Sequence, residues 1–401
     1  MMRFLVLLNL LFSACTNAQQ APSRSLELNP SIEVGAARTE LYINALNGKR
    51  VAIVGNQTSL IGHTHLVDSL LARKVNVVKV FAPEHGFRGD ASAGETIKDG
   101  KDAKTGLPLI SLYGKNKKPS AAMLQDVDVV LFDIQDVGAR FYTYISTMHY
   151  VMEAAAENGK RVIVLDRPNP NGFYVDGPVL DPKFSSFVGM HPIPVVHGCT
   201  VGELAQMING EGWLGGGKKC DLMVVPCGHY SHNDLYELPV APSPNLPNMS
   251  AVYLYPSLCW FEATEVSIGR GTNLPFQVLG YPGNKTGKYE FTPTDLPGVA
   301  MDPPQEGKKC TGHNLHEFGE FYMTSSKQLY LEWIVGMYES CEDKAKFFTA
   351  PEFFDKLAGT DAVRKQLIAG SGVSDLRKSW AHGIGAYRIM RKKYLLYPDF
   401  E

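Results

Sequence analysis

The sequence predicts an α/β fold, with a Rossmann-like doubly wound parallel sheet followed by a smaller α+β C-terminal auxiliary domain. Three observations predict this. Apolar runs alternate with helical segments in the first half of the chain, the runs are nearly continuous, and helical patterns dominate after residue 316. Near-continuous apolar runs are typical of parallel strands that are covered on both faces.

The predicted strands are four short runs rich in valine, isoleucine and leucine: Val51–Val54, Val75–Phe81, Val127–Phe132 and Arg161–Leu165. Predicted helices lie between them: His65–Arg73, Ser120–Gln125 and Tyr144–Asn158. Gly159 follows the last helix, and glycine commonly ends a helix at this position. Strands and helices that alternate in this way favour a doubly wound sheet.

The second half of the chain is less regular. Thr200 and Glu203 have the spacing of a capping box, which predicts a helix through Ile208. A proline-rich stretch, Pro239–Pro247, then interrupts regular structure, and residues 285–310 have the composition of a linker or long loop. Further helices are predicted at Glu317–Met323, Leu329–Ser340, Pro351–Leu357 and Asp361–Ala369. We therefore expect a Rossmann-like catalytic domain over residues 30–284 and an auxiliary domain over residues 285–401.

The N-terminus carries an export signal. Arg3 precedes an apolar run, Phe4–Phe12, which is too short to span a bilayer, so residues 1–18 are predicted to be a signal peptide. Cys15 follows two small residues and is a candidate for lipidation, whereas Thr16-Asn17-Ala18 offers a small-x-small cleavage site. We expect a periplasmic protein, either soluble or lipid-anchored through Cys15.

Composition and motifs exclude several classes of function. The 39 basic and 41 acidic residues nearly cancel, which disfavours binding to nucleic acid. The dinucleotide fingerprint GxGxxG is absent after the first strand, the esterase elbow GxSxG is absent, and the histidines lack recognised metal-ligand spacing. We expect no cofactor and no metal. The six cysteines beyond Cys15 are either buried thiols or include one disulfide, for which Cys220 and Cys227 are close enough.

Polar side chains follow each predicted strand, where ligands bind in open parallel sheets. They include Asn56 after the first strand, Glu84, His85 and Arg88 after the second, Asp133, Asp136 and Arg140 after the third, and Asp166 and Asn169 after the fourth. Carboxylates that share a crevice can act as acid and base on an acetal. Glu84 is the first candidate for the acid, because it lies on a loop leaving a buried strand, a partly desolvated setting. The alternatives are that Glu84 caps a turn or pairs with Arg88, and that Asp133 and Asp136 order their loops.

A further candidate segment runs from Phe261 to Thr272. It contains Glu262 and the tripeptide Gly269-Arg270-Gly271. The arginine side chain of this tripeptide has no neighbouring side chains on the backbone. This arrangement suits an anion site.

The chain resembles the exo-β-N-acetylmuramidases, formerly a family of unknown function. The resemblance runs from about Leu46 to the C-terminus and rests on ordered blocks of sequence. These are residues 55–58 (GNQT), 83–89 (PEHGFRG), 132–144 (FDIQDVGARFYTY), 166–170 (DRPNP), 197–203 (HGCTVGE), 243–247 (SPNLP) and 261–272 (FEATEVSIGRGT). Ala263 and Glu265 depart from the expected pattern, which leaves the binding subsite there open.

The resemblance implies an activity and a set of site residues. Family members remove terminal N-acetylmuramic acid from the non-reducing end of peptidoglycan fragments, with the glutamate of the Pro-Glu-His-Gly motif, here Glu84, as general acid. Asp133 or Glu262 would then act as nucleophile, or would orient a substrate acetamido group that attacks instead. Arg270, with Arg88 and Arg140 as substitutes, would bind the lactyl carboxylate of muramic acid. The expected substrate-binding residues are Asn56, His85, Arg88, Asp136, Arg140, Tyr142, Asn169 and Arg270.

Two other functions would also involve peptidoglycan. A wall-binding module would recognise muropeptides in this crevice without turnover, and a metal-dependent deacetylase or amidase would lose activity with a chelator. The intact loop that carries Glu84 favours the hydrolase.

Overall fold

The computed structural model of the protein describes residues 26–84, 86–88, 99–114 and 116–401, so the predicted signal peptide and Cys15 lie outside the described residues. Its centre is a seven-stranded sheet in the order β10-β9-β8-β2-β5-β7-β6, in which only β6 runs antiparallel to its neighbour. The strands are β2 (Val51–Gly55), β5 (Val77–Ala82), β6 (Gly100–Lys101), β7 (Pro108–Ser111), β8 (Val129–Asp133), β9 (Arg161–Leu165) and β10 (Asp221–Val225). This order confirms the predicted doubly wound sheet.

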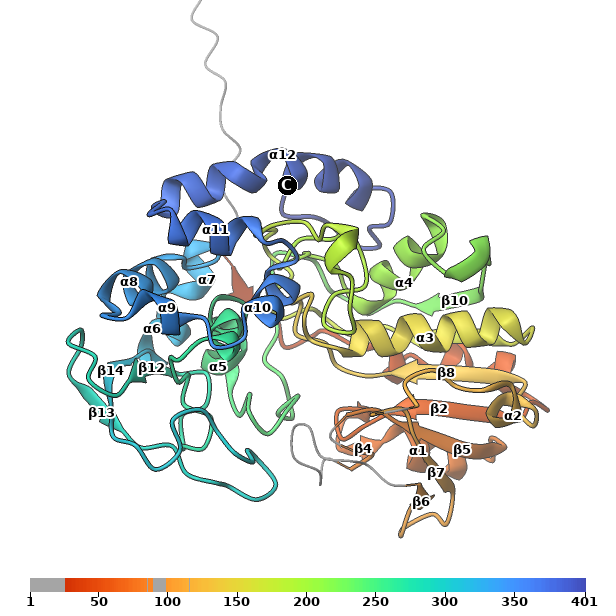
Figure 1. Ribbon diagram of the computed structural model, residues 1–401. Helices are drawn as coiled ribbons and strands as arrows, with labels where there is room; N and C mark the ends of the chain where they lie inside the picture. The colour runs from red at the N-terminus through yellow and green to blue at the C-terminus, as the bar shows by residue number, and fades with distance from the viewer. Residues whose placement is uncertain (1–25, 85, 89–98, 115) are drawn as a thin grey trace, which may run out of the picture.

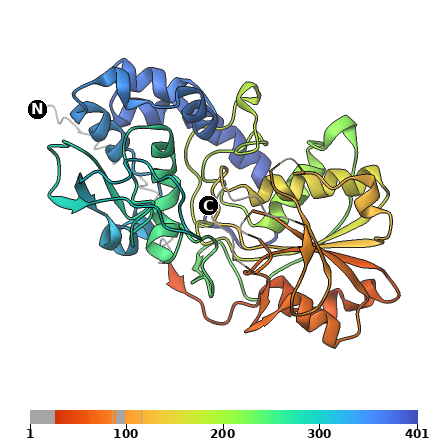
Figure 2. The ribbon, with the colours of Figure 1, turned by 60° about the horizontal axis from the view of Figure 1, so that its bottom comes forward.

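Helices cover both faces of the sheet (Figures 1 and 2). On one face, Val51 and Ile53 of β2 pack in the same apolar cluster as α1 (Leu66–Ala72). Ala52 and Val54 point to the opposite face and join a second cluster. That cluster contains residues of α2 (Ala121–Leu124), α3 (Tyr144–Glu157) and α4 (Val201–Gly210). The alternation of side chains along each strand therefore builds two layers of core.

The predicted elements of this half are found within a few residues. The capping box at α4 is complete, because the Thr200 side chain accepts from the Glu203 amide and the Glu203 carboxylate accepts from the Thr200 amide. The strands β6, β7 and β10, at the two sides of the sheet, were not predicted. Two short pairs of strands also belong to this half: β1 (Glu27–Leu28) with β11 (Asp234–Leu235), and β3 (Leu60–Ile61) with β4 (Thr64–His65).

The second part of the chain is built around α5 (Met249–Leu258) and a three-stranded antiparallel sheet (Figure 1). The sheet has the order β12 (Val278–Tyr281), β14 (Cys310–Asn314), β13 (Tyr289–Phe291). The boundary predicted at residue 285 falls within this sheet, because β12 pairs with β14 across it. The helices that follow are α6 (His316–Phe321), α7 (Met323–Ser326), α8 (Glu332–Ser340), α9 (Lys344–Phe347), α10 (Pro351–Ala358) and α11 (Ala362–Ile368).

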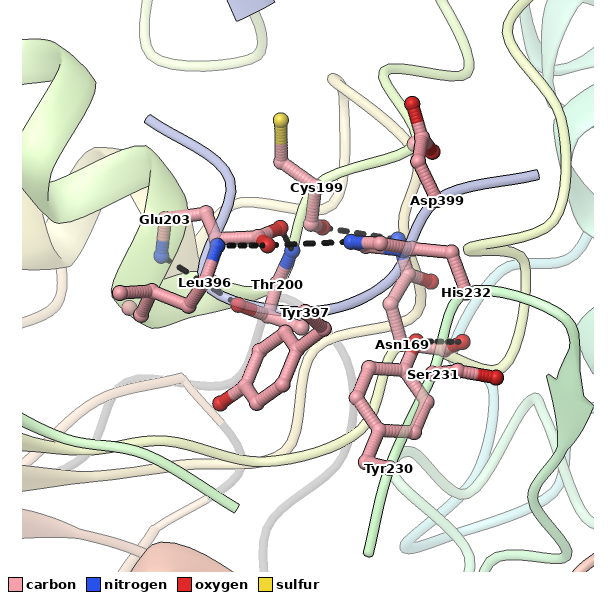
Figure 3. Close-up of polar contacts among 12 residues, drawn as sticks. Asn169, Cys199, Thr200, Glu203, Tyr230, Ser231, His232, Leu396, Tyr397 and Asp399 are labelled. Carbon is pink, nitrogen blue, oxygen red and sulfur yellow. Dashed lines mark hydrogen bonds and ion pairs between the residues drawn. The ribbon is translucent and has the colours of Figure 1, made fainter. Parts of the chain in front are cut away.

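The last helix, α12 (Val373–Arg391), returns the chain to the first domain, and the tail after it enters a buried polar network (Figure 3). The Leu396 amide donates to Glu203 at 2.9 Å, and the same carboxylate pairs with His232 at 3.0 Å. The Tyr397 hydroxyl donates to Asp166 at 2.5 Å. Tyr397 of the C-terminal tail is therefore buried in the interior of the Rossmann-like domain.

The cysteines from Cys199 to Cys341 are free and buried, which is the thiol alternative of the two predicted. Within the described ranges, no helix is long and apolar enough to cross a membrane.

Candidate active site

A cavity of about 520 Å³ lies beyond the carboxyl ends of β5 and β7, and loops from both parts of the chain line it. This volume is within the range of roughly 300–1,000 Å³ that small-molecule sites occupy. The aromatic lining residues are Tyr113, Phe141, Tyr142, Tyr144, Phe187, Tyr255 and Phe276. The charged and polar lining residues are Glu84, Lys117, Thr143, Ser243, Asn245, Glu262 and Arg270. Aromatic walls with a few polar groups suit a sugar ring, which has apolar faces and a polar edge.

Glu84 stands two residues after β5, and the segment that leads into α3 holds it in place. The Thr143 hydroxyl donates to the Glu84 carboxylate at 3.3 Å. The Tyr144 hydroxyl donates to the Glu84 backbone carbonyl oxygen at 3.4 Å. The same hydroxyl accepts from Nδ2 of the Asn56 side chain at 3.0 Å. The amide of Asn56, which is fully buried, thus supports the loop from behind. The structure brings the predicted residues Glu84, Tyr142 and Asn56 to one region, with Asn56 behind the lining.

Tyr113 is a neighbour of Glu84 that sequence reasoning missed. Burial, then the negative charge of Glu84 and a hydrogen bond to it, raise the pKa of Tyr113 above its ordinary value. The Arg270 guanidinium acts in the opposite direction, so both Glu84 and Arg270 are close enough to influence this phenol. The Tyr113 hydroxyl therefore stays protonated at neutral pH, as a donor beside the candidate acid.

Glu262 and Arg270 form an ion pair in the cavity wall. Arg270 Nη1 lies 2.8 Å from Glu262 Oε1, and each side chain is about one-quarter exposed or less. The Nε–H of Arg270 has no hydrogen-bond partner among the described residues. Gly269 and Gly271 flank the arginine with φ of 80° and 78°, and a Cβ at either would meet a backbone oxygen at 2.4 Å. The Gly-Arg-Gly step is therefore needed for this turn.

Asp133, a predicted catalytic residue, is not among the residues that line the cavity. It is fully buried at the end of β8, where its carboxylate makes a bidentate ion pair with Arg167, at 2.6 Å to Nε and 3.0 Å to Nη2. A carboxylate with both oxygens held in this way orders the strand ends and has no path to a ligand in the cavity.

Asp136 and Asn169, two predicted substrate-binding residues, are buried and do not line the cavity either. Asp136 Oδ1 accepts from the Gly138 amide at 2.7 Å, and its Oδ2 is buried without a partner among the described residues. Asn169 donates to the Cys199 carbonyl at 2.8 Å and accepts from the Asn171 amide at 2.8 Å. Both side chains fix loops.

The two arginines offered as substitutes for Arg270 have structural partners instead. Arg88 forms a bidentate pair with Asp102, with both distances at 2.8 Å. Arg140 is fully buried and donates to the carbonyls of Pro178, Ile193 and Leu357. Of the three candidates, Arg270 alone lines the cavity. His85 lies outside the described residues.

Several lining residues were not found from the sequence. Tyr113 and Lys117 follow β7, a strand that was not predicted. Lys117 Nζ lies 4.1 Å from the centre of the Phe187 ring, and these residues come from loops far apart in the chain. Asn245 does belong to a quoted block, Ser243–Pro247, so that motif was the available signal.

The fold and the site together define the class of this protein, a two-domain α/β protein with a glycosidase-like pocket. Its doubly wound α/β domain has a second domain beside it, and its cavity combines a carboxylate on a loop with aromatic walls. Two family models match the chain, "Exo-beta-N-acetylmuramidase NamZ, N-terminal" over residues 51–250 and "Exo-beta-N-acetylmuramidase NamZ, C-terminal" over residues 253–397. The chain belongs to this family, which confirms the resemblance seen in its motifs.

One curated relative and two solved structures are similar to this chain over most of its length. The peptidoglycan beta-N-acetylmuramidase NamZ of Bacillus subtilis (strain 168) is 38% identical over an alignment of 412 positions, which covers 97% of this chain and 97% of that protein. A crystal structure of a DUF1343 family protein from Bacteroides fragilis NCTC 9343 is 47% identical, with a TM-score of 0.85 over 92% of this chain and 99% of that one. A second DUF1343 family structure from that organism is 31% identical, with a TM-score of 0.73, and covers 91% and 99%.

Asp136 generates a prediction about pH. Burial raises its pKa from 3.8 to about 7, so the folded state holds the proton more tightly than the unfolded state does. Its contribution to stability is therefore full below about pH 4 and is lost as the pH rises to about 7, at up to about 1.4 kcal/mol per pH unit. We expect Asp136→Asn to remove this part of the slope of stability against pH. The measurement is the free energy of unfolding in urea at pH 5 and pH 7.5. The exposed Asp302→Asn is the control, and an unchanged slope in Asp136→Asn would contradict the assignment.

Proposed function

We propose that this protein is an exo-acting glycoside hydrolase that releases N-acetylmuramic acid from the non-reducing end of peptidoglycan fragments, with Glu84 as general acid. The observation that carries the proposal is the cavity itself, in which the Glu84 loop and the Glu262–Arg270 pair face the same space. Family membership and the printed activity of the Bacillus subtilis relative support it.

The reaction needs one proton donor at the bridging oxygen. Protonated Glu84 gives its proton to the glycosidic oxygen as the bond from that oxygen to C1 of the muramic acid breaks. Water later adds its oxygen at C1 and returns a proton to Glu84, which restores the acid. Thr143 and Tyr113 hold the carboxyl group in position, and Asn56 and Tyr144 hold the loop.

The second carboxylate of the cavity is Glu262. Its ion pair with Arg270 makes it a charge-balancing and orienting group, so the substrate's acetamido oxygen is the better placed nucleophile at C1. Asp133 then acts indirectly, by fixing Arg167 and the strand ends. Asp136, Asn169, Arg88 and Arg140 likewise act as supports.

The lactyl carboxylate of muramic acid is recognised by Arg270. One of its N–H groups holds Glu262, and its Nε–H is unpartnered among the described residues. Lys117 adds a second positive charge to the cavity wall. A substrate carboxylate there forms charge-assisted hydrogen bonds that an N-acetylglucosamine residue cannot form.

Export to the periplasm is the proposed location, either as a soluble protein or as a lipoprotein anchored at Cys15. The apolar run Phe4–Phe12 and the small residues before Cys15 support it. In a fractionated native host, the protein is expected outside the cytoplasm. If Cys15 is lipidated, Cys15→Ser moves the protein from the membrane fraction to the soluble fraction. Full-length protein found only in the cytoplasm would contradict the proposal.

Glu84→Gln is expected to lower turnover by about a hundredfold to ten-thousandfold, since the amide cannot donate the acid's proton. The measurement is release of free N-acetylmuramic acid from a muramyl-glucosamine disaccharide, alongside calorimetric binding and thermal unfolding. The matched control is Glu290→Gln, because Glu290 is an exposed residue of β13. Binding without turnover in the unaltered protein would favour the wall-binding alternative, and undiminished activity of folded Glu84→Gln would exclude the acid role.

Arg270→Met is expected to remove discrimination between sugars. The variant loses the carboxylate partner, so kcat/KM for an aryl N-acetylmuramide falls by about tenfold or more, while that for the matching N-acetylglucosaminide changes less. Arg161→Met, which breaks an exposed pair with Asp221, is the control. An equal loss on both substrates would show that Arg270 only supports Glu262.

A further inference from the structure

The Asn245 side chain lies in the cavity wall and has a buried acceptor without a hydrogen-bond partner among the described residues. The residue is 4% exposed and lines the cavity together with Glu84 and Arg270. Its Nδ2 donates to the Val299 carbonyl at 2.9 Å. Its Oδ1 is buried without a hydrogen-bond partner among the described residues. An unsatisfied buried acceptor is costly and is relieved by a ligand that donates to it.

The orientation of this amide is set by its surroundings. A carbonyl oxygen can only accept, so the contact with Val299 fixes which end of the Asn245 amide is the nitrogen. The Asn245 backbone amide donates to the Ser243 hydroxyl at 3.2 Å, and Ser243 and Leu246 form a bridge across the turn. The turn is therefore tied down on both sides, and Oδ1 cannot exchange places with Nδ2 without losing a bond.

Two carboxylates that were candidates for orienting the acetamido group already have partners. Glu262 Oε1 is held by Arg270 at 2.8 Å, and Cys259 Sγ lies 3.7 Å from Oε2. Asp133, which could have oriented an acetamido group, is buried in its pair with Arg167. Asn245 Oδ1 is thus a neutral acceptor of fixed direction in the cavity wall.

We infer that Asn245 accepts a hydrogen bond from the N–H of the substrate's 2-acetamido group. The inference rests on the proposed function and deepens it. The sugar hydroxyls can rotate, and each can accept as well as donate, so water or several protein groups can satisfy them. The acetamido N–H is a single donor on a planar, stiff group, and it needs an acceptor of fixed direction. Asn245 Oδ1 has that property.

This contact makes Asn245 a specificity and positioning residue. With its N–H held, the planar acetamido group has one orientation, and its carbonyl oxygen is set relative to C1. A sugar without the acetamido group leaves Oδ1 buried and unpaired, which is the basis for rejecting it.

The test is calorimetric binding of two ligands, the methyl β-glycoside of N-acetylmuramic acid and its 2-deoxy analogue, which lacks the acetamido group. Asn245→Leu is expected to weaken binding of the first by about tenfold and to leave binding of the second unchanged within twofold. Asn245→Ala is the second variant, in case the leucine side chain prevents folding, and thermal unfolding identifies folded protein. Asn284→Leu is the matched control, because Asn284 is equally buried but does not line the cavity.

Equal weakening of both ligands in folded Asn245 variants, or no weakening of either, would overturn the inference. Failure of the unaltered protein to bind the N-acetylmuramic acid glycoside would overturn the proposed substrate, and the inference with it. Weaker binding of the N-acetylmuramic acid glycoside alone, in Asn245 variants that remain folded, supports Asn245 as the acetamido acceptor.

Discussion

The cavity depends on one apolar core that is shared by both parts of the chain. The cluster on the α3 face of the sheet continues through α5 and into α8, α10, α11 and α12. Glu84 and Thr143 stand on the sheet side of this core, whereas Glu262 and Arg270 stand beyond α5. Since close-packed interiors transmit small displacements, the distance between these two groups is fixed by packing throughout the core.

Buried polar contacts lock the two parts in register where the apolar core alone would allow sliding. Asp176 accepts from Arg377 and Trp380 of α12 and from the Leu329 amide. Arg140 donates to the Leu357 carbonyl at the end of α10. If the two parts slid past each other within the buried interface, Arg140 would lose one of its carbonyl acceptors and Asp176 would lose its donors from α12, and a buried polar group that loses a partner is costly. The charges of the interior therefore specify the geometry of the cavity.

This use of buried charge explains how far the sequence could predict the site. The rule that loops meet beyond the ends of parallel strands placed Glu84 correctly at the cavity, and the apolar runs located β2, β5, β8 and β9. The rule does not say which way a side chain turns. Asp133 and Arg88 stand in predicted strand-end loops, but each turns toward a charged partner inside the fold. Their pairing is a long-range property that local sequence does not encode.

The missed elements have equally specific physical reasons. β7 contains Pro108 and is only partly buried, so it lacks the continuous apolar run of a central strand. With β7 unpredicted, Tyr113 had no strand end to follow. α12 contains Gly383 and Gly385, and glycine is a poor helix former, which weakens the helical pattern. Tertiary contacts such as the hydrogen bond from Tyr387 to the His197 carbonyl stabilise the helix.

The charges that line the cavity also bear on how the sugar is attacked. A carboxylate nucleophile must approach C1 with a free oxygen lone pair, and Glu262 already has one oxygen held by Arg270 and a thiol near the other. Freeing it would leave the guanidinium without its partner at the moment when the substrate carboxylate also needs that guanidinium. In the proposed mechanism, the acetamido oxygen arrives with the substrate, is oriented through its own N–H, and leaves the Glu262–Arg270 pair intact. In the proposed mechanism, Glu262 therefore positions Arg270, and Arg270 positions the sugar.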